Sequence, residues 1–302
     1  MITAIWNRAV WLGVLAACHW GTVAPAQNIS SREAVDTTAN LGLPREADGR
    51  RADLLSAFHG LDALPLLSNM ICRGSRGYGG MPVIFSTEID LETMQAGDFR
   101  VVRHSGEVGT LHCVSVLPAT DPGELRTVLL IGDLGPSDAD PPVSVEIVGH
   151  LQSRGGTLDF KGASVAVTPL ADGPTLILAE PVKDWTLVGT LGPRRVRGSL
   201  CPEDGTLQAA RVTWAGGVTR EDGSEAGDAE RDLYVVTVEG PDSTRRDITP
   251  AALANLGDGD NNHMLCLETT DRPVSVAFPA GFLADPNKDL NPATRVEVTP
   301  SR

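Results

Sequence analysis

The sequence predicts an all-β protein made of two successive β-sandwiches, and three observations lead to this prediction. The chain has 32 glycines and 21 prolines in 302 residues, a density of turn-forming residues that favours many short strands. In the run 210–214, Arg211 and Thr213 alternate with Val212 and Trp214, as in a strand with one buried face. The third observation is an internal repeat of roughly 100 residues, the size of one sandwich.

The clearest evidence for the repeat lies at the C-terminal ends of its two copies. The sequence Pro-Val-Ser-Val at 142–145 returns at 273–276, and Val-Ala-Val-Thr-Pro at 165–169 returns as Val-Glu-Val-Thr-Pro at 296–300. The first and last prolines are 27 residues apart in both copies (169 − 142 and 300 − 273). Matches in the same order and at the same spacing indicate a duplicated unit.

The N-terminal ends of the copies also match. Cys72 precedes the strand-like Val83–Ser86 by 11 residues, and Cys201 precedes Val212–Ala215 by the same distance. Further upstream, 64–67 (Leu-Pro-Leu-Leu) is matched with 176–179 (Leu-Ile-Leu-Ala), giving copies over 62–169 and 173–300. We therefore expect one sandwich in 62–170 and another in 171–302. The strands expected in the second copy are 210–214, 233–238, 263–268, 274–278 and 294–298.

The N-terminus predicts export. Its apolar run, Ala9–Ala17, is shorter than the ~20 residues that span a bilayer, so residues 1–26 are expected to be a signal peptide cleaved after Ala26. Alternatively, Leu-Ala-Ala-Cys at 15–18 is similar to a bacterial lipobox, in which case residues 1–17 are removed and Cys18 carries lipid.

Residues 27–61 are expected to be a flexible tether with a short helix. Residues 27–51 are polar and show no periodicity, whereas 52–63 could place Leu54, Leu55 and Phe58 on one helical face. The folded sandwiches are expected to begin after this segment.

Four cysteines remain after the signal segment: Cys72, Cys113, Cys201 and Cys266. An even number in an exported chain favours disulfides, and four cysteines allow three pairings. The repeat suggests one bond in each copy, Cys72–Cys113 and Cys201–Cys266; four buried thiols are the alternative.

The chain is acidic, with a net charge of -14 and a sequence pI of about 4.8. Such a charge repels phosphate backbones and anionic lipids, so a nucleic-acid partner is not expected. It is compatible with hard cations such as Ca²⁺. No second long apolar run exists, so no membrane span is expected either.

The first copy carries a recognisable pattern. Val83–Asp90 holds a strand ending in Phe-Ser followed by an acidic turn, Gly97–Val101 holds Phe-Arg-Val, and Gly106 follows. This pattern resembles the opening of bacterial immunoglobulin-like domains of surface-layer and adhesin proteins. Such domains end near an acidic, Asn-containing loop, and 158–162 and 285–291 stand at that place.

The resemblance covers most of 81–169 and, more faintly, 208–300, where Trp214 replaces the Phe. It implies two tandem immunoglobulin-like β-sandwiches in an extracellular setting. It implies no catalytic residues.

Three acidic loops of the second copy, at 220–232, 258–262 and 285–291, are expected to lie together at one end of its sandwich. In the loops 258–262 and 285–291, every second residue has a side-chain oxygen, and such oxygens are the ligands that Ca²⁺ prefers. The same residue types are also common turn formers. The candidate calcium ligands are Asp258, Asp260, Asn262, Asp285, Asn287 and Asp289.

No familiar catalytic motif is present, such as a nucleophile elbow, a His-Glu-x-x-His helix or a phosphate-binding loop. The sequence therefore favours a non-enzymatic binding or structural protein of the cell envelope or extracellular space, with an unknown protein or surface glycan as partner. The alternative is an extracytoplasmic hydrolase or lyase with an acidic site around Asp258, Asp260 and His263.

Overall fold

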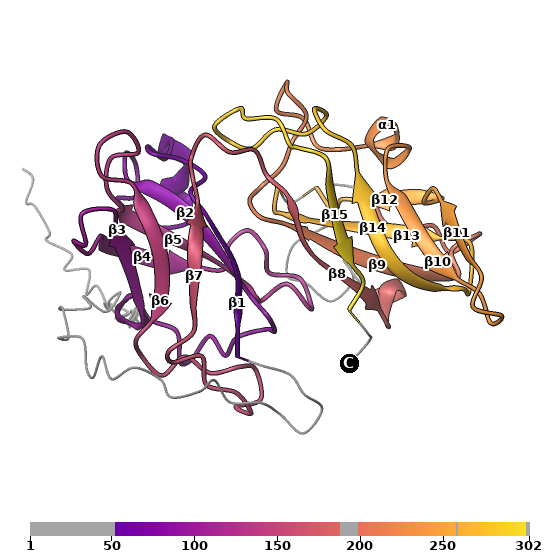
Figure 1. Ribbon diagram of the computed structural model, residues 1–302, viewed down its shortest axis with the longest axis horizontal. Helices are drawn as coiled ribbons and strands as arrows, with labels where there is room; N and C mark the ends of the chain where they lie inside the picture. The colour runs from indigo at the N-terminus through magenta and orange to yellow at the C-terminus, as the bar shows by residue number, and fades with distance from the viewer. Residues whose placement is uncertain (1–51, 188–198, 258, 300–302) are drawn as a thin grey trace, which may run out of the picture. The chain divides into compact units, whose positions relative to one another are not determined.

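The computed structural model describes residues 52–187, 199–257 and 259–299 (Figure 1). The expected signal peptide, the candidate lipidation site Cys18, most of the tether and Asp258 lie outside these residues. The regular secondary structure of the described part is almost entirely β-strand, so the all-β prediction is confirmed. It contains no helix that is long and apolar enough to cross a membrane.

The first half of the protein forms a seven-stranded sheet in the order β3-β6-β7-β1-β2-β5-β4. Two short 3-10 helices, η1 (Leu66–Met70) and η2 (Ala96–Asp98), lie in its loops. Aromatic rings from distant strands meet in one apolar core, where Phe85 contacts both Phe99 and Phe160 edge-on. The strands are β1 Leu54–Phe58, β2 Gly79–Phe85, β3 Phe99–Arg103, β4 Thr110–Ser115, β5 Thr127–Asp133, β6 Pro142–Ile147 and β7 Ser164–Thr168.

The second half forms two four-stranded sheets, in the orders β11-β10-β14-β15 and β12-β13-β9-β8. They enclose a separate apolar core in which Trp214, Tyr234 and Phe278 are packed together. The five strands expected here are present, with ends within two residues of the expected ones. The strands are β8 Leu176–Val182, β9 Gln208–Trp214, β10 Val235–Glu239, β11 Arg245–Ile248, β12 Ala252–Ala254, β13 Asn262–Leu267, β14 Arg272–Phe278 and β15 Thr294–Glu297; the helical turns are η3 Trp185–Leu187 and α1 Asp228–Arg231.

The short helix expected within 52–63 is wrong, because this segment contains strand β1. Leu54, Ala57 and Phe58 are all buried, and β1 pairs antiparallel with β2 and parallel with β7. An isolated helix of this length is marginal in water, whereas a short apolar run gains partners on both edges inside a sheet. The tether prediction for 27–61 therefore fails at its C-terminal end, and the first half begins before residue 62.

The strand pairing shows which segments of the two halves correspond. Ala57 of β1 lies beside Val167 in parallel, and Ala179 of β8 lies beside Val298 in parallel. The counterpart of 176–179 is thus β1, not Leu64–Leu67, which lies in a loop and the first turn of η1. The earlier match failed because the loop after β1 holds a second leucine-rich run.

A shared irregularity supports the equivalence of the later strands. The pairing of β3 with β6 shifts between Val102 and Arg103, and the pairing of β10 with β14 shifts between Thr237 and Val238. Both shifts fall opposite the repeated Pro-Val-Ser-Val segment. Because bulges of this kind are local features of a fold, their common position indicates two copies of one arrangement.

Each half contains one disulfide, as the repeat suggested. Cys72 is bonded to Cys113 of β4, and Cys201 is bonded to Cys266 of β13. The two bonds are not equivalent in the fold, because β4 lies at the edge of its sheet and β13 lies inside its sheet. They close loops of 41 and 65 residues.

Candidate binding site at the junction of the two halves

The three acidic loops lie close together at one end of the second half. Thr219 and Ala284 exchange backbone hydrogen bonds, which joins the loop after β9 to the loop after β14. The side-chain amide of Asn255 donates to the backbone oxygen of Ala226 at 2.6 Å, which joins the loop between β12 and β13 to the first. Part of this end of the second half packs against the first half.

The candidate calcium ligands fall into two separate groups. Asp260 accepts hydrogen bonds from the backbone N–H of Asn262 at 2.7 Å and from its side-chain amide at 2.8 Å. In the loop 285–291, Asn287 donates to Asp289 at 2.7 Å. Throughout residues 52–187, 199–257 and 259–299, no three His, Cys, Asp or Glu side chains gather as a metal site requires. The candidate ligands therefore make bonds that a bound cation would have to replace.

Asp285 is buried, with an exposed fraction of 0%. One of its oxygens accepts the backbone N–H of Asp289 at 2.9 Å, and the other has no hydrogen-bond partner among the described residues. Burial disfavours the charged form and raises the pKa of Asp285 to about 6.

A pair of buried carboxyl groups lies where the two halves meet. Glu124, from the loop before β5, is hydrogen-bonded to Asp260, from the loop before β13. Burial and the neighbouring Asp260 raise the pKa of Glu124 well above its usual value, and burial also raises the pKa of Asp260. Of the two groups, Glu124 therefore keeps its proton to the higher pH, and its carboxylic O–H donates a hydrogen bond to the Asp260 carboxylate.

Two arginines and one further glutamate lie next to this pair. The cluster consists of Glu124, Asp260, Arg126, Glu180 and Arg211. The Nε atom of Arg211 on β9 lies 3.6 Å from Glu124, and a guanidinium N–H of Arg126 lies 3.1 Å from Glu180 on β8. With one proton held on Glu124, these groups and Asp260 together carry no net charge. That balance suits a site shielded from water, where unpaired charge is costly.

Further contacts join the halves around the cluster. A guanidinium N–H of Arg211 donates to the backbone oxygen of Pro122 at 2.7 Å. Gly216 approaches the ring of Phe58 so closely that an added Cβ would lie 2.8 Å from it. Buried polar bonds and this close approach position the halves against each other.

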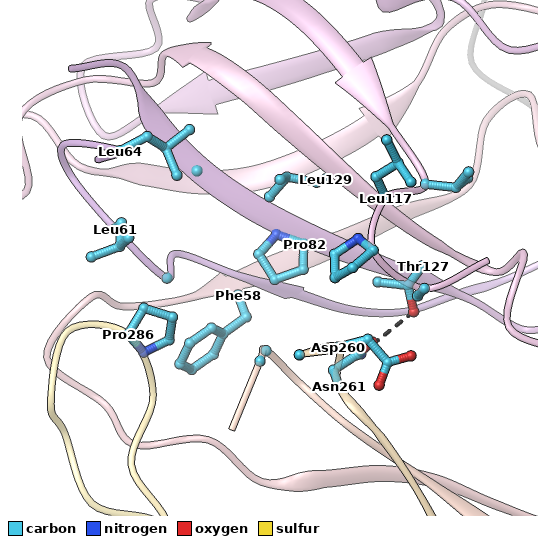
Figure 2. Close-up of a pocket in the computed structure, with 18 residues that line it drawn as sticks. Phe58, Leu61, Leu64, Pro82, Leu117, Thr127, Leu129, Asp260, Asn261 and Pro286 are labelled. Atoms are coloured by element: carbon cyan, nitrogen blue, oxygen red, sulfur yellow. Dashed lines mark hydrogen bonds between the residues drawn. The ribbon is translucent and has the colours of Figure 1, made fainter. Parts of the chain in front are cut away.

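An open pocket of about 170 Å³ lies beside the cluster, with walls from both halves (Figure 2). Its lining is apolar except for Thr127, Asp260 and Asn261. In Figure 2, Phe58 and Pro286 lie on one side of the pocket, and Asn261 and Thr127, joined by a hydrogen bond, lie on another. Other residues that line it are Leu64, Pro82, Leu117, Leu129 and Gly217.

His263, the remaining residue of the acidic site expected from sequence, is 2% exposed in the second core. Its Nδ1 atom is 2.8 Å from the hydroxyl of Tyr234, which also accepts the indole N–H of Trp214 at 3.0 Å. Burial lowers the pKa of His263 to about 4, so the ring is neutral near pH 7. This chain of bonds connects three core side chains.

The sequence predicted Asp260 as a site residue but did not predict a role for Glu124 or Arg211, or the pocket. Arg211 gave a misleading signal, because its alternation with Val212 and Trp214 predicted a strand face in contact with water. That prediction is wrong for β9, where Arg211 is 4% exposed and Thr213 on the same face is 1% exposed. Glu124 gave no signal, since its loop resembles any polar turn. No protein-family model and no curated protein matches this chain.

Proposed function

We propose that the chain is an exported, non-enzymatic binding or structural protein of the cell envelope or extracellular space, built from two immunoglobulin-like sandwiches. The strand order supports this fold. The seven-stranded sheet can be divided where β1 pairs with β7, which gives the two groups β1-β2-β5-β4 and β3-β6-β7. These groups correspond to the A-B-E-D and C-F-G sheets of immunoglobulin-like domains. The second half repeats this order and adds β11 next to β10.

The observation that carries the proposed role is the junction. Asp260, a candidate calcium ligand and a catalytic candidate only in the alternative function, is 8% exposed and is bonded to Glu124 and Asn262. His263 is enclosed beside Tyr234. These groups therefore support a scaffold that holds two sandwiches together and presents a pocket and loops to a partner.

Two intramolecular disulfides are compatible with an extracytoplasmic location, because such bonds persist in oxidising compartments. Soluble secretion and a lipid anchor through Cys18 both remain predictions. Fractionation of cells that produce the Cys18→Ala variant separates them: release from the membrane supports the anchor, and an unchanged soluble location supports secretion.

The partner is sought by pull-down with the purified protein, in Ca²⁺ and in EDTA, from culture fluid and envelope extract. The expected result is a protein or glycan that is retained specifically and released by excess free protein. Retention of nothing above the background of an unrelated immobilised protein would contradict the binding function. Calcium stabilisation stays a prediction, and a melting temperature identical in Ca²⁺ and EDTA would contradict it.

A second candidate function rests on the carboxyl pair itself. Two carboxyl groups that share one proton beside a pocket are an arrangement used by acid–base hydrolases. Hydrolysis of ester, peptide or glycoside substrates that is lost in Asp260→Asn, and kept in a variant of the exposed Asp138, would favour this enzyme over the binding protein.

A further inference from the structure

The size of the junction pocket limits what it can hold. A cavity of ~150 Å³ in another protein binds benzene, whereas sites for drug-sized ligands have ~300–1,000 Å³. At about 170 Å³, the pocket has room for one ring and little else.

The walls of the pocket favour a flat group. Phe58, Pro82, Pro118 and Pro286 contribute rings, and several glycines contribute backbone without side chains. Figure 2 shows the rings of Phe58, Pro82 and Pro286 around the space. The proline rings offer apolar carbon atoms for van der Waals contact with a ring placed between them, and the Phe58 ring, which is 0% exposed, closes one side.

The polar atoms of the lining are already used within the protein. The carboxylate of Asp260 accepts the backbone N–H of Asn262 on one oxygen and its side-chain amide N–H on the other. The side-chain amide of Asn261 donates to the backbone oxygen of Trp214 at 2.7 Å and to Thr127 at 3.4 Å. A charged ligand would therefore lose its hydration without gaining an equivalent partner, so the occupant is expected to be neutral.

The segment 61–70, next to the pocket, contains several exposed apolar side chains. Leu61 and Leu64 line the pocket, and Leu66, Leu67 and Met70 follow directly in η1 with exposed fractions of 62%, 70% and 79%. Exposed apolar residues beside a pocket are typical of a protein interface, in which one buried aromatic anchor is surrounded by weaker contacts.

We infer that the junction pocket receives a single neutral aromatic side chain, Phe or Tyr, from a protein partner. This inference rests on the proposed binding function and names the chemistry that the partner presents.

The test uses the purified protein with four probes: toluene, phenol, N-acetyl-phenylalanine amide and cyclohexane. We expect ligand-observed NMR to show millimolar binding of the first three and at least about tenfold weaker binding of cyclohexane. Equal binding of toluene and cyclohexane would overturn the aromatic assignment. If toluene binds and N-acetyl-phenylalanine amide does not, the occupant is a free small molecule, and the assignment to a protein side chain is overturned.

Two matched glycine variants locate the binding. A Cβ at Gly217 would meet only the backbone oxygen of Asp260, at 3.9 Å, so Gly217→Leu should fill the pocket without disturbing the fold. A Cβ at Gly97, in η2, would meet nothing within 4 Å, so Gly97→Leu is the control. We expect Gly217→Leu to weaken probe binding at least about tenfold and Gly97→Leu to leave it unchanged.

Melting temperatures of both variants show that they fold. Equal probe affinity in a folded Gly217→Leu variant would refute the pocket. Partner capture by this variant as strong as by wild type would refute the inference while the binding function stands. Sedimentation that shows self-association abolished by Gly217→Leu would identify a second copy as the occupant, which also overturns the inference.

Discussion

The pH dependence of stability provides a direct test of the buried carboxyl at Asp285. This side chain is fully buried, and one oxygen lacks a hydrogen-bond partner among the described residues. Burial raises its pKa from 3.8 to about 6. The folded protein therefore keeps this proton over a pH range in which the unfolded chain has released it.

The sign follows from that difference. Because the folded-state pKa is the higher one, the contribution of Asp285 to stability is fully present below about pH 4 and is lost as the pH rises to about 6. The shift of about two pKa units corresponds to a loss of about 3 kcal/mol in the free energy of unfolding.

Urea unfolding followed by circular dichroism measures this loss in the wild type and in Asp285→Asn, which cannot ionise. The difference between their free energies of unfolding should change by about 3 kcal/mol from about pH 3.5 to about pH 7, in favour of the variant at the higher pH. The control is Asp138→Asn, which removes an exposed carboxylate. A difference that stays constant with pH, within about 0.5 kcal/mol, would refute the reasoning.

Three further changes test the junction, the second core and the disulfides. Glu124→Gln has a neutral side chain at every pH. Its melting temperature should therefore fall less than that of the wild type as the pH rises through the raised pKa of Glu124. Curves of melting temperature against pH that run parallel for the two proteins would contradict the shared proton. Tyr234→Phe should lower the free energy of urea unfolding by about 1–3 kcal/mol, because a buried indole and imidazole lose their common partner, whereas Tyr78→Phe at the surface should change it little; equal effects would count against the network. Replacing Cys201 and Cys266 together by Ala should destabilise the protein by about 4 kcal/mol, from the loop of 65 residues that the bond closes, and calorimetry that finds no change would rule this out.

The strand content and the twofold repeat could be predicted because their signals are local. The repeated Pro-Val-Ser-Val segment and the alternation in β9 depend only on neighbouring residues and on spacing, and both marked strands correctly. The alternation did not predict exposure, because both faces of β9 are buried. Strand β1 shows where such signals fail: its run of Leu, Ala and Phe suits a helix face and a strand equally, and pairing with β2 and β7 decided between them.

The candidate site could be predicted only in part. The acidic loops were visible as sequence, and their convergence follows from the strand order. The proton shared by Glu124 and Asp260 was not visible, because it depends on burial and on a partner 136 positions away in the chain (260 − 124).

The sequence by itself determined that this chain forms many short strands in two similar halves, each with one pair of cysteines, since periodicity, turn residues and repetition are properties of the linear chain. Only the tertiary structure decided that Arg211 and Asp260 hold the halves together and that a pocket opens beside them. The physical reason is that burial and the direction of a hydrogen bond arise when distant segments exclude water from one another, and no local pattern encodes them.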